Sequence, residues 1–190
     1  MKILQLITLI LTFQISTVSA QKTFTIDGVN VPRTIEFLDA KLSLNGGGTI
    51  SKSSSNGFVQ ALYLSQLRQD AKYIIADNSE MGMRIQITSS GLTSNKLIKI
   101  FDDSFEKTLG KKEDDLKPEI AKFLGFLHGD INKGDVFKFM YSATESSVYV
   151  YKNDKLKGKV KGLNFKKALF GIWLSDKPID EKLKNHLLGK

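Results

Sequence analysis

The sequence contains no cysteine. The chain therefore forms no disulfide and offers no thiolate as a nucleophile or as a metal ligand. Its two histidines, His128 and His186, lie far apart near expected helix ends, and no cluster of acidic residues accompanies either of them. Histidine in this position is typical of a solvated or capping residue. We therefore predict no transition-metal site, no cofactor and no cysteine-based catalysis.

After its first twenty residues, the sequence also lacks any apolar run long enough to cross a bilayer. Those first residues begin with the basic Lys2, continue with a mostly apolar stretch at 3–15, and end on Val18-Ser19-Ala20. This order is typical of a signal peptide, and its apolar part is too short for a membrane anchor. We predict that residues 1–20 are a signal peptide, removed on export to leave a chain that begins at Gln21.

The mature chain has no repeats, no Pro-rich linker and no low-complexity tract. We therefore expect one domain, residues 21–190, whose length allows it to bury about 70% of its unfolded surface. Removal of Lys2 leaves 27 basic and 20 acidic residues, so the net charge falls from +8 to +7. The basic residues are spread along the chain and no basic–aromatic module is present, so we expect no nucleic-acid partner.

Four lysines alternate with other residues along one expected strand: Lys155, Lys157, Lys159 and Lys161. Because side chains on a strand alternate between the two faces of the sheet, this spacing predicts that the four lysines share one face. Such a face suits an anion or an anionic lipid surface. It also suits an edge strand that is protected from pairing with other sheets, and this interpretation is favoured.

Hydrophobic periodicity predicts both strands and helices. Strands are expected at 23–26, 41–44, 58–64, 83–87, 136–141 and 148–151, with a two-residue turn at Asn153-Asp154 leading into the lysine-bearing strand. Helices are expected from Asp70 to Ala76, from Thr93 or Ser94 to Gly110, from Asp114 or Asp115 to Gly129, after Asn164 and after Asp180. Because strands and helices occur in separate groups, the sequence predicts an α+β fold with an antiparallel sheet and helices on one face.

Several motifs, in the same order along the chain, resemble those of the bacterial chalcone-isomerase-like family. They are Gly28–Ile35 (GVNVPRTI), Leu44–Gly48 (LNGGG), Ala61–Leu64 (ALYL), Ile131–Val136 (INKGDV), Val148–Lys155 (VYVYKNDK) and the C-terminal stretch from Lys157 to Gly189. The resemblance implies an open-faced β-sandwich, a large antiparallel sheet covered on one face by a layer of helices. It also implies a ligand cleft between the two layers.

The resemblance further implies where catalytic residues would stand. Chalcone isomerases hold an anionic oxygen with an arginine and orient a water or phenol with a threonine, a tyrosine and an asparagine. The matching positions in this sequence are Ile50, a position near Phe58, one near Thr93 and one near Ile100. None carries the family's residue. Because ring closure of a phenolate needs a fixed positive charge and hydrogen-bond donors, we assign no catalytic residue.

The leading hypothesis is an exported, non-catalytic protein that binds a small hydrophobic molecule, such as a fatty acid or polyketide, between sheet and helices. The candidate ligand-binding residues are Thr49, Ile50, Tyr63, Thr88, Thr93, Leu97 and Phe101. Two alternatives stay open: an intramolecular lyase or isomerase with an altered polar site, and a structural or partner-binding envelope protein. Resemblance to Gram-negative proteins implies the periplasm, with secretion as the other destination. The ligand and the oligomeric state are not specified by the sequence.

We predict that the exported protein begins at Gln21, because small residues occupy the positions that a signal peptidase inspects. N-terminal sequencing of the protein recovered after export measures this directly. A membrane-bound product that still carries Met1 to Ala20 contradicts the prediction.

Overall fold

The structure is a computed structural model that describes residues 23–50 and 57–190, so the expected signal peptide lies outside the described residues. The strands are β1 (Thr23–Ile26), β2 (Val29–Pro32), β3 (Thr34–Phe37), β4 (Ala40–Gly48), β5 (Phe58–Leu64), β6 (Met81–Ile87), β7 (Val136–Ser142), β8 (Ser147–Lys152) and β9 (Lys155–Lys161). The helices are α1 (Ala71–Ala76), α2 (Ser94–Leu109), α3 (Lys117–Gly125), α4 (Leu163–Leu174) and α5 (Glu181–Leu187), with a 3-10 segment, η1 (Gly110–Leu116), before α3.

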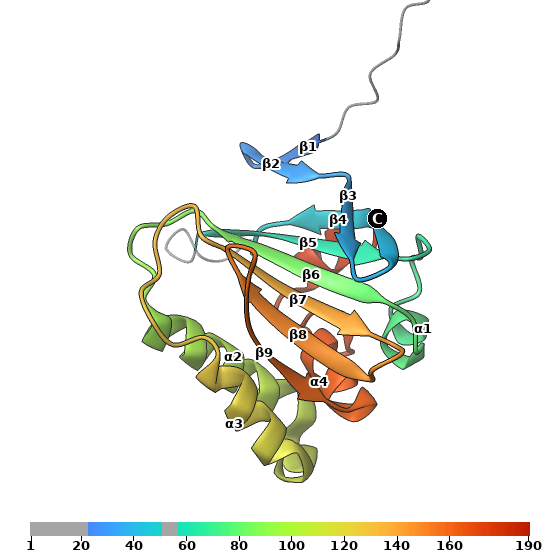
Figure 1. Ribbon diagram of the computed structural model, residues 1–190, viewed down its shortest axis with the longest axis vertical. Helices are drawn as coiled ribbons and strands as arrows, with labels where there is room; N and C mark the ends of the chain where they lie inside the picture. Colours follow the sequence, from blue (N-terminus) through green and yellow to red (C-terminus); the bar gives the residue numbers. More distant parts are fainter. Residues whose placement is uncertain (1–22, 51–56) are drawn as a thin grey trace, which may run out of the picture.

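Strands β3 to β9 form one antiparallel sheet in which each strand pairs with the next along the chain (Figure 1). Strands β1 and β2 form a separate hairpin. The helices interrupt the strand series only after β5, after β6 and after β9. This arrangement confirms the predicted α+β fold with an antiparallel sheet. In the described part of the chain, none of the helices combines the length and the apolar composition of a membrane span.

The two faces of the sheet carry two separate hydrophobic cores. The larger core lies between the sheet and the helices, where Phe101 of α2, Phe123 of α3 and Phe139 of β7 meet edge to face with ring centroids 5.1–5.5 Å apart. The smaller core lies on the other face, under the β1–β2 hairpin and β3. There Phe37 of β3 contacts Tyr149 of β8 at 5.4 Å between ring centroids, which shows how strongly the sheet curls.

The glycine run of β4 allows α5 to lie directly on the sheet. A Cβ atom at Gly46 would stand 2.1 Å from the carbonyl oxygen of His186 in α5, so no larger residue fits there. The strand pairing with β5 also shifts between Leu44 and Gly46, which marks a β-bulge at Asn45. The bulge frees the Asn45 side chain to bond Leu187 and Arg68 at 2.8–2.9 Å. The run therefore combines a bulge with close approach of the α5 backbone.

Helix α4 inserts a lysine into the interior. Lys166 has no exposed surface, and its Nζ atom donates to the carbonyl oxygens of Ile74, Ile75 and Asp77 at 2.8–2.9 Å. These carbonyls belong to the last turn and the C-cap of α1, which have no partners within that helix. Burial lowers the pKa of Lys166 to about 8, so the side chain is still an ammonium at neutral pH and uses all three N–H groups.

We predict that Lys166→Met lowers the free energy of unfolding by about 2–4 kcal/mol, because it leaves three carbonyl groups without a charged donor. The matched control is Lys167→Met, since its neighbour Lys167 is half-exposed; we expect a change within about 0.5 kcal/mol. Urea unfolding followed by circular dichroism measures both. Equal stabilities of the two variants would show that Lys166 does not hold α1 in place.

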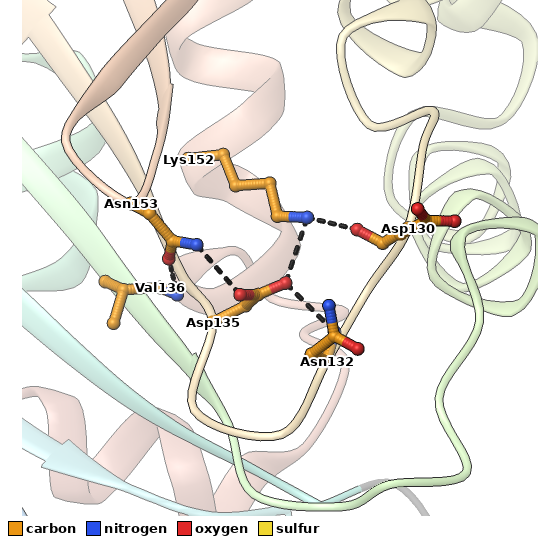
Figure 2. A network of polar contacts seen from close by, with 6 residues as sticks. All are labelled: Asp130, Asn132, Asp135, Val136, Lys152 and Asn153. Carbon is orange, nitrogen blue, oxygen red and sulfur yellow. Dashed lines mark hydrogen bonds and ion pairs between the residues drawn. The ribbon is translucent and has the colours of Figure 1, made fainter.

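The INKGDV motif (Ile131–Val136) and the VYVYKNDK motif (Val148–Lys155) meet in one polar network (Figure 2). Asp135 accepts hydrogen bonds from Asn153 Nδ2 at 2.8 Å and from the backbone N–H of Asn132 at 2.9 Å, and it pairs with Lys152 Nζ at 2.9 Å. Lys152 also donates to the carbonyl of Asp130. The network ties the loop before β7 to the β8–β9 turn. These motifs therefore hold the fold together at one end of the sheet.

Partial burial opposes ionisation of Asp135, but the hydrogen bonds from Asn153, Asn132 and Lys152 outweigh it and lower the pKa of the carboxyl group. The folded state thus holds the ionised form more strongly than the unfolded state does. This contribution to stability is complete well above about pH 4 and disappears as the pH falls through the lowered pKa.

We predict that Asp135→Asn destabilises the protein by about 1–3 kcal/mol at pH 7, because the half-buried Lys152 ammonium and the Asn153 amide lose a charged acceptor. The stability difference from the wild type should shrink as the pH falls below about 4, where the wild-type carboxyl group takes up a proton. Asp154→Asn is the control, since Asp154 is 84% exposed and its pair with Lys138 is solvated. A difference that is independent of pH contradicts the ionic interpretation.

Three sequence-based expectations are wrong in detail. Helix α4 begins at Leu163 rather than after Asn164, because Gly162, at φ 123°, turns the chain directly from β9 into the helix. The third helix begins at Lys117, after η1, because Pro118 suits only its first turn. The lysines of β9 do not share one face. The pairing with β8 shifts at Lys157, which separates Lys155 from Lys159 and Lys161.

Candidate functional site

A small cavity lies inside the larger core, between the sheet and helices α2 and α4. Its volume is about 10 Å³, which is close to that of one water-sized group. The residues around it come from β5, β6, α2, α4 and the segment after α4. They are Phe58, Gln60, Ile85, Leu97, Ile100, Phe101, Ser104, Ile172, Trp173 and Ile179.

Local sequence patterns place these side chains on the cavity wall. Alternation along β5 sends Phe58 and Gln60 toward the helices, and Val59 toward the smaller core. On α2, Leu97 and Phe101 are four residues apart and so lie on one helix face. Thr93 fixes where this helix starts, because its side-chain oxygen accepts from the Lys96 backbone N–H at 3.3 Å.

One polar group interrupts the apolar wall. Gln60 is 1% exposed, and its Oε1 accepts a hydrogen bond from Nε1 of Trp173. Its Nε2 has no partner among the described residues. Ser104, the other polar residue of the lining, donates its hydroxyl hydrogen to the carbonyl of Ile100 in its own helix. The cavity therefore offers the unused N–H groups of one amide and the lone pairs of one hydroxyl oxygen.

No charged side chain is among the ten described residues that line the cavity. An anion placed there would lose its hydration without gaining a cation, which costs several kcal/mol. Elsewhere in the described ranges, no group of three or more histidine, cysteine, aspartate or glutamate residues stands close enough to hold a metal ion. The chemistry that the lining supports is burial of apolar surface with one or two neutral hydrogen bonds.

The structure brings two of the seven candidate ligand-binding residues, Leu97 and Phe101, to the cavity. Ile50 is half-buried and packs against the same core without lining the cavity. The positions that match the family's threonine and asparagine, Phe58 and Ile100, do line it. The wall is therefore apolar at these two positions.

The other four candidates lie elsewhere. Tyr63 lies in the smaller core on the opposite face, where its hydroxyl donates to the carbonyl of Pro32 at 2.7 Å. Thr49 donates to Asp27 at 2.7 Å in a surface groove of about 650 Å³ between β1, β4 and α5. Thr88 is half-buried at the end of β6, and Thr93 is the exposed cap of α2.

Four residues that matter at the cavity were not among the candidates: Gln60, Ser104, Trp173 and Ile179. The sequence did contain a signal for Gln60, since it is the only polar residue at the helix-facing positions of β5. Nothing in the local pattern pairs it with Trp173, which is 113 positions away.

A sequence profile described as chalcone isomerase-like matches residues 23–189. The chain belongs to this family. Among solved structures, its fold is similar to that of a fatty-acid binding protein from Arabidopsis thaliana, with a TM-score of 0.66 and 15% sequence identity over 85% of this chain and 92% of the other. A likeness at that identity establishes the fold. Among curated proteins, no sequence matches this one. The family resemblance drawn from the motifs is confirmed.

Proposed function

We propose that this chalcone isomerase-like protein binds a small hydrophobic molecule between its sheet and its helices and performs no chemistry on it. The observation that carries the proposal is the wall of the cavity, which is apolar apart from Gln60 and Ser104 and has no charged residue. The fatty-acid binding function named for the Arabidopsis protein of the same fold supports it. The signal-peptide pattern supports export, with the periplasm as the proposed compartment.

The same wall argues against catalysis. General acid–base chemistry needs a side chain that exchanges protons near the working pH, and the lining residues include no histidine, lysine or carboxylate. Stabilising a phenolate needs a fixed cation. Ile50, which stands at the family's arginine position, supplies none. A ligand held here is therefore bound and released unchanged.

Ligand binding requires the cavity to enlarge. Pockets that hold drug-sized molecules have volumes of about 300 Å³ or more, against about 10 Å³ here. Ile179 lines the cavity and also a surface hollow of about 490 Å³ that includes Lys107 and Pro178. The two spaces therefore adjoin at this side chain. We infer that the ligand passes at Ile179, between α2 and the segment after α4.

Two hydrogen bonds keep this passage closed. The backbone N–H of Ile179 donates to the carbonyl of Ile172 at 2.7 Å, and Lys107 Nζ of α2 donates to the carbonyl of Pro178 at 2.6 Å. The Lys107 bond is only partly buried, so water can replace it at a small cost in free energy. Exchange of this bond for water would release the segment from α2 while its bond to α4 remains.

The sole tryptophan of the chain reports on the proposed site, since Trp173 is 2% exposed and lines the cavity. We expect fatty acids and alcohols brominated near mid-chain to quench its fluorescence saturably. Affinity should rise by about 0.8 kcal/mol, or about fourfold, for each added CH₂. If neither ligand class quenches Trp173 or raises the melting temperature, this function is wrong and the structural or partner-binding alternative takes its place.

We predict that Ile179→Ala speeds ligand association, measured by stopped-flow quenching of Trp173, because it removes the side chain between cavity and surface hollow. Its stability should fall by about 1–2 kcal/mol, since Ile179 is half-buried. Ile98→Ala is the matched control, because Ile98 is also half-buried against the core but does not line the cavity. Equal association rates in the two variants exclude passage at Ile179.

A further inference from the structure

The hydrogen bond between Gln60 and Trp173 fixes which way the Gln60 amide points. An indole N–H can only donate, so the group that faces it must be the amide oxygen. The amide nitrogen is then held on the other side, where it has no partner among the described residues although Gln60 is 99% buried. A buried N–H group without an acceptor is costly, and the great majority of such groups in folded proteins are bonded.

We propose that Gln60 Nε2 binds the head group of the ligand and that this head group is a neutral oxygen acceptor, such as that of an alcohol, aldehyde, ketone or ester. The proposal rests on the function proposed above and adds the chemical class of the ligand. The cavity beside the amide, at about 10 Å³, accommodates one oxygen-sized group in its present form. The alkyl chain extends from there into the space that opens at Ile179.

Because the described lining carries no charged side chain, it favours a neutral head group over a carboxylate. Both accept a hydrogen bond from an amide N–H, but only the carboxylate needs a cation to offset its lost hydration. Lys166, the buried lysine of the same helix as Trp173, has all three N–H groups bonded to the end of α1 and does not line the cavity. A fatty acid would therefore have to bind in its protonated form.

Ser104 refines the choice among neutral head groups. Its hydroxyl hydrogen is used by the carbonyl of Ile100, so its oxygen is left as an acceptor in the same lining. An alcohol can accept from Gln60 and donate to Ser104 at once, whereas an aldehyde, ketone or ester can only accept. We therefore expect alcohols to bind more tightly than esters of equal chain length.

The test compares three ten-carbon chains on the full-length mature protein: decanol, decanoate and 1-chlorodecane, whose head group is a poor acceptor. Binding is followed by the emission of Trp173 at pH 7.5, below the aggregation concentration of each ligand. We expect decanol to bind more than about tenfold more tightly than decanoate. Decanoate should gain affinity as the pH falls toward its own pKa, while decanol should not change.

Two variants assign the effect to the named atoms. Gln60→Met should weaken decanol about two- to tenfold relative to 1-chlorodecane, because it removes the donor but keeps the length of the side chain. Gln66→Met, on the exposed segment after β5, is the control and should change neither ligand. Ser104→Ala should weaken decanol but not methyl decanoate, and it provides a second variant should Gln60→Met fail to fold.

Different outcomes separate this proposal from the function on which it rests. If decanoate binds as tightly as decanol, or if the ratio of decanol to 1-chlorodecane affinity survives both Gln60→Met and Ser104→Ala, the head-group proposal is overturned and hydrophobic binding stands. If none of the three chains changes Trp173 emission, the proposed function fails and this proposal falls with it.

Discussion

Burial of α4 on nearly every side is the constraint on which the rest of the structure depends. From Phe165 to Leu174, Lys167 alone is not buried. A helix that is apolar all round cannot lie on a surface, so the sheet and the other helices must enclose it. From this buried position α4 makes three contacts that hold other elements. Lys166 donates to the carbonyl groups at the end of α1, and Trp173 donates to the Gln60 amide oxygen. The carbonyl of Ile172 accepts from the backbone N–H of Ile179 in the segment after α4.

This central helix also explains why the proposed ligand site is uncharged. The helix layer meets the sheet through tightly packed aromatic rings, among them Phe101 of α2 and Phe139 of β7 at 5.5 Å between centroids. The one buried cation in α4, Lys166, is committed to carbonyl groups of α1. The space that remains beside Gln60 has mostly apolar walls, the free amide N–H of Gln60 and the acceptor oxygen of Ser104, which suits a neutral molecule with a single oxygen at one end.

The sequence was sufficient for the elements with strong periodicity. Helix α2 begins after its Thr93 cap and ends at Gly110 as expected, and α1 and α5 follow their aspartate caps. Strands β2 and β3 were not anticipated, because Pro32 lies at the end of β2 and a proline within such a run argues against a strand. The bulge at Lys157 could not be read from alternation either, since it depends on pairing with β8.

The site was harder to predict than the fold for a physical reason. Strand alternation alone places Tyr63 on the opposite face from Gln60, so that part of the geometry was present in the sequence. The cavity itself forms where β5, α2, α4 and the segment around Ile179 meet. Contacts of that kind depend on how separate elements pack, which a single sequence does not contain.

Native mass spectrometry of the exported protein, purified without detergent, tests the central claim most directly. We predict a noncovalent adduct of one small, neutral, oxygen-containing lipid, lost when the protein is unfolded and absent or strongly reduced when Gln60 is replaced by methionine. Protein that emerges at its bare mass, and still does so after incubation with long-chain alcohols and acids, would contradict a ligand-binding function.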